Sequence, residues 1–282
     1  MKALLARLFA PQWAGGWTAM RLAYVAAALI TIVPTARFIE DAYGAQDAVF
    51  SHPPLRLNDV YHPTLAEAWG WWGGAVLGLL ALGWGGRLAR PGLLLYLVCL
   101  WVYLGAEAMN TKAYHRLLTW EALALLFAPI GERTLTEKWR SPFARYVLLL
   151  VFMAMYGSTG WLKALHEPAW IDGSVLQHHL VDLHFGVKPL GAWVSGQRWL
   201  TAPMGWITVI FEAFFPLLIL FRRLSLPTLL VGASFHVGIA LMMEIDAFSW
   251  VALAAYPVLL HPEVAEGLYR RAQAWRDARK PA

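Results

Sequence analysis

Charged residues and cysteine are both scarce in this sequence. Only 15% of the 282 residues are charged, 59% are hydrophobic, and the mean hydropathy is +0.50. A water-soluble domain of this length would need far more polar surface. The single cysteine, Cys99, excludes an internal disulfide and any zinc or iron–sulfur site that needs several thiolates. The composition therefore favours a protein that is embedded in a lipid bilayer.

Apolar stretches recur along almost the whole chain, and many approach the roughly 20 residues that a helix needs to cross a bilayer. We predict an all-α fold, a polytopic membrane helix bundle of about eight transmembrane helices that forms a single domain over residues 1–282. The first span is too long for a removable signal peptide and lacks a small-residue cleavage site, so we expect a signal anchor. The predicted spans are residues 16–37, 66–84, 93–109, 114–130, 144–165, 202–221, 227–243 and 247–260.

Lysine and arginine gather in alternate loops, which marks one side of the bundle as cytoplasmic because basic loops are retained there during insertion. This rule predicts that both termini are cytoplasmic. It also accounts for the net charge of +5, so we expect membrane lipid, and no nucleic acid, as a partner. The predicted location is the cell membrane, which in a bacterium is the inner membrane. The basic side carries Lys2, Arg7, Arg87, Arg90, Arg133, Lys138, Arg140, Arg145, Arg222, Arg223, Arg270, Arg271, Arg276, Arg279 and Lys280.

Two segments beside the spans are predicted to form structure of their own. Residues 166–201 mix Trp170, Trp193 and Trp199 with polar residues, which is typical of a segment in the membrane interface on the outer side. Residues 262–282 form a basic cytoplasmic tail, which we predict to be a short surface helix on anionic lipid.

The ionisable residues inside or beside the spans are the candidates for chemistry. Each costs about 2.5 to 3.5 kcal/mol near the centre of a transmembrane helix, so such residues tend to face the bundle interior. With the predicted topology, Lys163 and His115 fall at outer helix ends, and Glu212 and His236 lie nearer the middle. We expect these four side chains to face one cavity that is open to the outer side.

Each candidate also has a structural interpretation. Lys163 in an apolar pocket could be a neutral base, or its ammonium could reach the headgroups. His115 could donate a hydrogen bond to an oxyanion or cap its helix. His236, between glycine and serine residues, could bind a ligand or join two helices by a hydrogen bond. Glu212 needs a partner, either His236 or Lys163, in a structural ion pair or a proton relay.

The run QHHLVDLH places His178, His179, Asp182 and His184 close together. On a helix His178 and Asp182 share a face, which is a possible spacing for metal ligands, whereas His179 points elsewhere. The HExxH motif and the clustered histidine boxes of membrane di-iron enzymes are absent from the sequence. We therefore expect no metal site and no haem between His115 and His236.

The sequence around Lys163 resembles a known family. The stretch GSTGWLKALHEPAWIDG, residues 157–173, is similar to the Gly-x-x-Lys and Trp-x-x-Gly signature of the membrane domain shared by vitamin K-dependent gamma-carboxylase and HTTM (horizontally transferred transmembrane) proteins. A polar connector, a Glu and Pro pair and a Phe-His pair arrive in the same order, and the resemblance covers residues 110–248. These further pieces are residues 110–115, Glu212 with Pro216, and Phe235 with His236.

The resemblance implies a mechanism. In the carboxylase a lysine deprotonates reduced vitamin K, and oxygen then converts the hydroquinone to an epoxide while a glutamate side chain is carboxylated. By this likeness the catalytic residues would be Lys163 as the base and His115 as the stabiliser of negative charge, with reduced vitamin K or menaquinol as the cofactor. The residues expected to bind substrate are Asn110, Tyr114, Trp161, Trp170, Glu212 and His236.

The sequence also departs from the carboxylase. The animal enzyme has two adjacent lysines where this chain has Leu162 and Lys163, and it continues into a large lumenal region. A related bacterial family acts in production of a sporulation-delaying peptide toxin, so the fold alone does not determine the activity. Two alternatives therefore stay open. One is a non-catalytic membrane protein for peptide binding, maturation or export, and the other is a transporter that uses Glu212 and His236.

Overall fold

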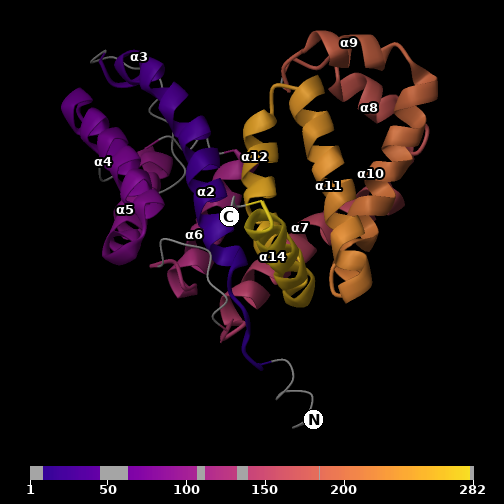
Figure 1. Ribbon diagram of the computed structural model, residues 1–282. Helices are drawn as coiled ribbons and strands as arrows, with labels where there is room; N and C mark the ends of the chain where they lie inside the picture. Colours follow the sequence, from indigo (N-terminus) through magenta and orange to yellow (C-terminus); the bar gives the residue numbers. More distant parts are fainter. Residues whose placement is uncertain (1–8, 45–62, 107–111, 132–138, 184, 280–282) are drawn as a thin grey trace. The chain divides into compact units, whose positions relative to one another are not determined.

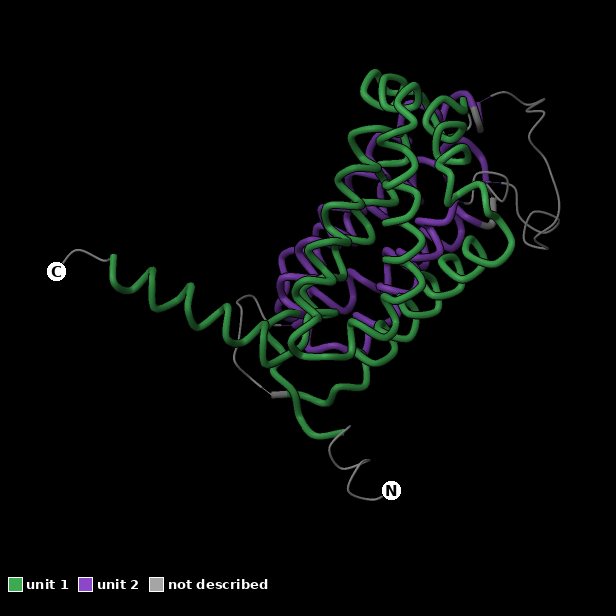
Figure 2. The backbone as a smooth tube through the Cα atoms, turned by 90° about the vertical axis from the view of Figure 1, so that its right-hand side faces the viewer, with its two compact units in different colours: residues 1–16, 137–282 green, residues 17–136 purple. Residues whose placement is uncertain are grey.

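The computed structural model describes residues 9–44, 63–106, 112–131, 139–183 and 185–279, and almost all of its regular structure is helical (Figure 1). The prediction of an all-α fold is confirmed. The chain divides into two compact units, which Figure 2 shows in different colours. Unit 1 comprises residues 1–16 and 137–282, and unit 2 comprises residues 17–136.

Unit 2 is built around a tight helical hairpin, α4 and α5. A capping box starts α4, in which the Thr64 side chain accepts the backbone N–H of Glu67 and the Glu67 carboxylate accepts that of Thr64. The two helices approach closely where Gly78 and Gly92 face each other, since a Cβ at either one would strike the other helix's backbone. The elements are α2 (Gly16–Ile32), η1 (Val33–Phe38), α3 (Ile39–Tyr43), α4 (Leu65–Trp84), η2 (Gly86–Leu88), α5 (Ala89–Ala106) and α6 (Ala113–Phe127).

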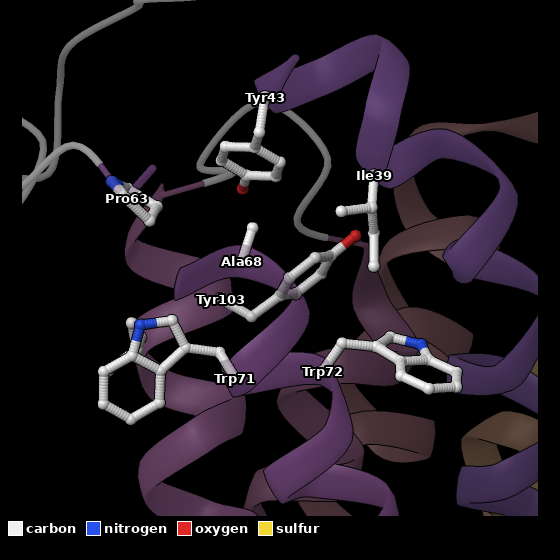
Figure 3. Close-up of a pocket in the computed structure, with 8 residues that line it drawn as sticks. Ile39, Tyr43, Pro63, Ala68, Trp71, Trp72 and Tyr103 are labelled. Carbon is white, nitrogen blue, oxygen red and sulfur yellow. The ribbon is translucent and has the colours of Figure 1, made fainter. Parts of the chain in front are cut away.

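The interior of unit 2 is well filled. The buried Arg21 donates a hydrogen bond to the carbonyl of Ile130 at 2.7 Å, and the Tyr24 hydroxyl donates one to the carbonyl of Leu118 at 3.0 Å. Figure 3 shows a small hollow in this unit, between the side chains of Tyr43, Tyr103 and their aromatic neighbours. Its volume is about 10 Å³, which is room for about one water molecule, so it is too small for an organic ligand.

Unit 1 consists of a helix pair, α7 and α10, to which further helices add. Its short strands β1 (Gln12–Trp13) and β2 (Trp139–Arg140) pair antiparallel near the start of α7. The helices are α7 (Phe143–His166), η4 (Pro168–Trp170), α8 (Ser174–His179), α9 (Pro189–Ser195), α10 (Arg198–Leu218), α11 (Arg222–Met242), α12 (Asp246–Ala254), α13 (Tyr256–Leu259) and α14 (Pro262–Asp277).

The segment between α7 and α10 folds into a small helical layer, residues 167–197, which we call the cap. Figure 1 shows α8 and α9 of the cap at one end of α10 and α11. The cap has its own apolar core, in which Leu180 and Val194 pack with Met243. Lys188 fastens it to α11 and α12, because its Nζ lies 2.7 Å from the carbonyl of Ala240 and 3.7 Å from Asp246.

Six helices within the described residues are long and apolar enough to cross a membrane. They match six of the eight predicted spans and support an integral membrane protein. The fourth predicted span corresponds to the 15-residue α6, and the eighth to the shorter apolar segment Asp246–Leu259. The predicted tail helix exists as α14, which projects from the other helices of unit 1 (Figure 2). The orientation of the helices in the membrane stays a prediction.

Candidate functional site

Two glycines allow α7 and α10 to pack closely in unit 1. A Cβ at Gly160 would collide with the backbone of Glu212 and Ala213, and a Cβ at Gly157 would lie 2.8 Å from Cγ of Pro216. Because later residues of α7 meet earlier residues of α10, the two helices run antiparallel. The close approach brings the side chain of Lys163, one turn beyond Gly160, to the level of Glu212.

Lys163 and Glu212 form a bidentate ion pair. The Nζ of Lys163 donates to Oε1 of Glu212 at 2.8 Å and to Oε2 at 2.7 Å. The side chains are 19% and 7% exposed, respectively, so both charges are largely removed from solvent. Such a pair persists because each charge compensates the other, whereas either group alone would be costly to bury.

The ammonium of Lys163 also lies over an aromatic ring from the cap. Its Nζ is 4.4 Å from the centre of the Trp170 ring, which is a favourable cation–π distance. The Trp170 Nε1–H donates to the Glu167 carboxylate at 2.6 Å, which holds the ring in place. Gly173 has a φ of +80° and packs against the α10 backbone, where a side chain would not fit. The Gly-x-x-Lys and Trp-x-x-Gly pieces thus form one structural unit.

A cavity of about 300 Å³ adjoins this ion pair. Its walls are mostly apolar and come from α7, α10, α11, the start of α12 and the cap. Lys163 and Glu212 are its charged wall residues. The charge of the wall is therefore confined to one place on an otherwise apolar surface. The wall residues are Met155, Tyr156, Thr159, Lys163, Trp170, Leu176, His179, Phe185, Thr208, Glu212, Phe235, Ile239, Met243, Ile245 and Phe248.

Three further polar groups face this space from different elements. The hydroxyls of Thr159 and Thr208 each donate to a carbonyl of their own helix at 2.9 Å, which leaves their oxygens as acceptors. His179 of the cap lies between the rings of Trp170 and Phe185, and its Nδ1 is buried without a hydrogen-bond partner among the described residues. Burial, followed by the charge of the neighbouring His178, lowers the pKa of His179 below 6.5, so its ring is neutral at pH 7.

Behind the cavity wall lies a hydrogen-bonded group of rings. The Tyr156 hydroxyl is 2.5 Å from Nε2 of His236 and 3.4 Å from the hydroxyl of Tyr256. His236 is fully buried and is not one of the wall residues, whereas Tyr156, its hydrogen-bond partner, lines the cavity. The structure therefore pairs Glu212 with Lys163, which is one of the two partners considered from the sequence, and pairs His236 with Tyr156.

A comparison with protein-family models identifies this region. The model of the HTTM domain matches residues 130–263. The matched residues are slightly less than half of the chain and resemble an HTTM domain. Every residue of the cavity wall lies inside the matched range, so the site lies in the part of the chain that resembles an HTTM domain. No curated protein and no solved structure matched the chain.

The cavity wall does not include the other predicted site residues that the structure describes. Trp161 is 50% exposed and packs beside Phe214, because it sits two positions before Lys163 and so faces a different side of α7. Trp161 does not line the cavity, and its contact with a substrate stays a prediction. Tyr114 and His115 begin α6 in unit 2, before the matched residues, and Asn110 lies outside the described residues.

His115 has the capping contact that the sequence analysis considered as its structural role. Its Nδ1 accepts the backbone N–H of Lys112 at 3.1 Å. Because Nδ1 acts as an acceptor, the proton of a neutral His115 ring must be on Nε2. The His115 ring therefore caps the start of α6 through Nδ1 and carries an N–H donor at Nε2.

The histidine run of the cap contains a pair of side chains at the predicted spacing. Nε2 of His178 lies 3.7 Å from the Asp182 carboxylate, one helical turn away. Within the part of the chain that the structure describes, no three His, Cys, Asp or Glu residues form a group that could hold a metal ion. His184 lies outside the described residues.

Sequence reasoning missed several wall residues of the HTTM domain. Tyr156, Thr159 and Thr208 sit in apolar helices, where a single hydroxyl residue gives little functional signal. A helical-face comparison would have found Thr159, because it lies four positions before Lys163 and shares its face. The role of His179 in the wall depends on how the cap folds back on α11, which no local pattern indicates.

Proposed function

We propose that this HTTM protein is a membrane enzyme that takes a hydroquinone, or another lipophilic hydroxyl compound, into the cavity of unit 1 and removes its hydroxyl proton at the Lys163–Glu212 ion pair. The observation that carries the proposal is the Lys163–Glu212 ion pair in the wall of an otherwise apolar cavity. An ion pair that only stabilises the fold has no need of such a cavity beside it.

The cavity is suited to a flat ring with a polar edge. A volume of about 300 Å³ lies at the lower end of the range for small-molecule sites, and Phe185, Phe235 and Phe248 supply apolar contact for a ring. The hydroxyl of such a ring would meet the ion pair, where an ammonium in a low-dielectric site stabilises a developing oxyanion more strongly than water does.

The finer part of the proposal follows from the resemblance to the gamma-carboxylase. We propose reduced vitamin K or menaquinol as the compound and molecular oxygen as the second reactant, so that one hydroquinone and one oxygen molecule give one epoxide and one water. His115 lies in unit 2 and is not part of this cavity, so we assign it no step of the reaction.

Anaerobic titration with reduced menaquinone tests the binding step. The full chain in lipid nanodiscs should show saturable quenching of tryptophan fluorescence, because Trp170 lines the cavity. Lys163→Ala should weaken this binding at least tenfold, whereas Arg271→Ala, which removes a basic residue of α14 outside the cavity wall, should leave it within about twofold. A folded Lys163→Ala protein that binds and reacts as well as the wild type would refute the proposal.

One surface favours a second candidate, a non-catalytic protein that binds or helps to export a peptide. The cap exposes Leu183, which is 89% accessible, and Trp193, and the adjoining start of α10 exposes Trp199. This candidate predicts that a Trp193→Ser and Trp199→Ser double variant loses peptide capture and that Lys163→Arg, which keeps the charge, is tolerated. Loss of hydroquinone turnover in Lys163→Arg with peptide capture unchanged would favour the enzyme instead.

A further inference from the structure

The bidentate ion pair raises the question of which atom accepts the substrate proton. Both oxygens of Glu212 accept hydrogen bonds from the Nζ of Lys163, at 2.8 and 2.7 Å. An ammonium has three donors and no lone pair, so Lys163 in this state has no site for another proton. The carboxylate of Glu212 has free lone pairs and lies in the cavity wall.

We propose that Glu212 is the catalytic proton acceptor and that Lys163 is the cation that holds the resulting oxyanion. This inference rests on the proposed function and assigns Glu212 a role beyond substrate binding. The substrate O–H bond breaks and a carboxyl O–H bond forms on Glu212. The proton moves directly, or Lys163 passes its own proton to Glu212 and takes the substrate proton in its place. Both routes end in the same state.

The charge balance favours this assignment. Before transfer the cavity wall holds one ammonium and one carboxylate, and the ligand is neutral. After transfer the ammonium of Lys163 lies beside the oxyanion of the ligand, and Glu212 is neutral. The number of charges is unchanged, so no ion is created without a counterion in an apolar space. A neutral Lys163 acting alone would instead require Glu212 to remain as an uncompensated anion.

The other polar groups of the wall are poorer acceptors. The hydroxyls of Thr159 and Thr208 are weak bases whose protons are already donated to helix carbonyls. Tyr156 is engaged with His236 on the far side of the wall. His179 would become a second cation close to Lys163 if it took the proton, since both flank the ring of Trp170.

Binding of 4-nitrophenol to the full chain in nanodiscs provides the test, because the phenol and its anion absorb at different wavelengths. For the wild type we expect the bound anion, a new infrared C=O band of one protonated carboxyl group, and no proton released to the medium. For Glu212→Gln we expect the bound anion without the band and with one proton released for each probe. Glu266→Gln, which changes a glutamate paired with Arg270 on α14, should behave as the wild type.

The outcomes distinguish a failure of the Glu212 assignment from a failure of the proposed function. A band that persists in Glu212→Gln, or a wild type that releases one proton for each bound probe, would overturn the inference while leaving the cavity as the binding site. Absence of probe binding to the folded wild type would refute the proposed function itself. If Glu212→Gln does not fold, the Lys163→Gln and Glu212→Gln double variant removes both charges together. It should bind no anion and show no band, and a band there would also overturn the inference.

Discussion

Replacing Gly160 with alanine should separate the two helices that form the site. An ideal Cβ at this position would lie 2.5 Å from the carbonyl carbon of Glu212 and 2.7 Å from Cα of Ala213. Carbon atoms that are not bonded prefer about 3.5 to 4.0 Å, so α10 would have to retreat by about 1 Å. Backbone atoms cannot turn aside as a flexible side chain would. The ion pair would then stretch beyond about 3.5 Å, where hydrogen bonds are weak.

The energetic cost follows from two opposing effects. Overpacking of this kind costs about 1 to 3 kcal/mol, and the upper end applies because the clash is with backbone. Alanine in a helix interior recovers up to about 1 kcal/mol relative to glycine. We therefore expect Gly160→Ala to lower the free energy of unfolding by about 2 kcal/mol.

A series of glycine substitutions in mixed micelles, unfolded by SDS, measures this effect. Gly70→Ala in α4 is the matched control, since a Cβ there meets no atom within 4 Å, and it should be neutral or stabilising. Gly157→Ala should fall between the two, because its neighbour at 2.8 Å is a side-chain atom of Pro216. Equal stability of Gly160→Ala and Gly70→Ala would show that close packing of α7 on α10 does not hold the site together.

Three further predictions concern the cap and its contacts. Lys188→Ala removes the bond to the Ala240 carbonyl and should raise hydrogen exchange of residues 174–195, while exchange in α7 stays unchanged. Trp170→Leu should be less stable than Trp170→Phe by about 0.5 to 1 kcal/mol, because only the phenyl ring keeps a cation–π contact with Lys163, and equal SDS midpoints would contradict this. Burial lowers the pKa of His179 below 6.5, so below that pH the folded cap binds fewer protons than the unfolded chain and its stability falls as the pH drops. Hydrogen exchange of the cap at about pH 7 and about pH 5 should show this loss in the wild type and a smaller one in His179→Gln.

The membrane fold was largely predictable because hydropathy is a property of local sequence. Six predicted spans coincide with long apolar helices. The α6 segment was harder, since its apolar stretch is only 15 residues long and such a length does not distinguish a span from a buried helix. The division into two units places residues 1–16 with the second half of the chain. This grouping depends on contacts between segments that are distant in sequence, which a hydropathy pattern does not indicate.

The sequence indicated part of the candidate site, namely Lys163, Trp170 and Glu212, but not how these residues pair. Glu212 had two possible partners in the sequence, and the choice of Lys163 depends on how Gly160 sets the register of α7 against α10. Trp170 and Trp161 were both predicted to bind substrate, and of the two only Trp170 lines the cavity beside Lys163. The helical period accounts for the position of Trp161, since two positions correspond to about 200° around the helix. A hydrogen bond between helices was one of the two interpretations of His236, but the sequence did not indicate Tyr156 as its partner.

The most direct test of the central claim is single-turnover epoxide formation. The purified protein is loaded with reduced menaquinone without oxygen, oxygen is then admitted, and the products are analysed by mass spectrometry. If the ion pair carries out the proton transfer, the wild type should form one epoxide for each active site, and a folded Lys163→Ala variant should form none above background. Equal epoxide formation by the two proteins, or no epoxide from a wild type that has bound the hydroquinone, would contradict it.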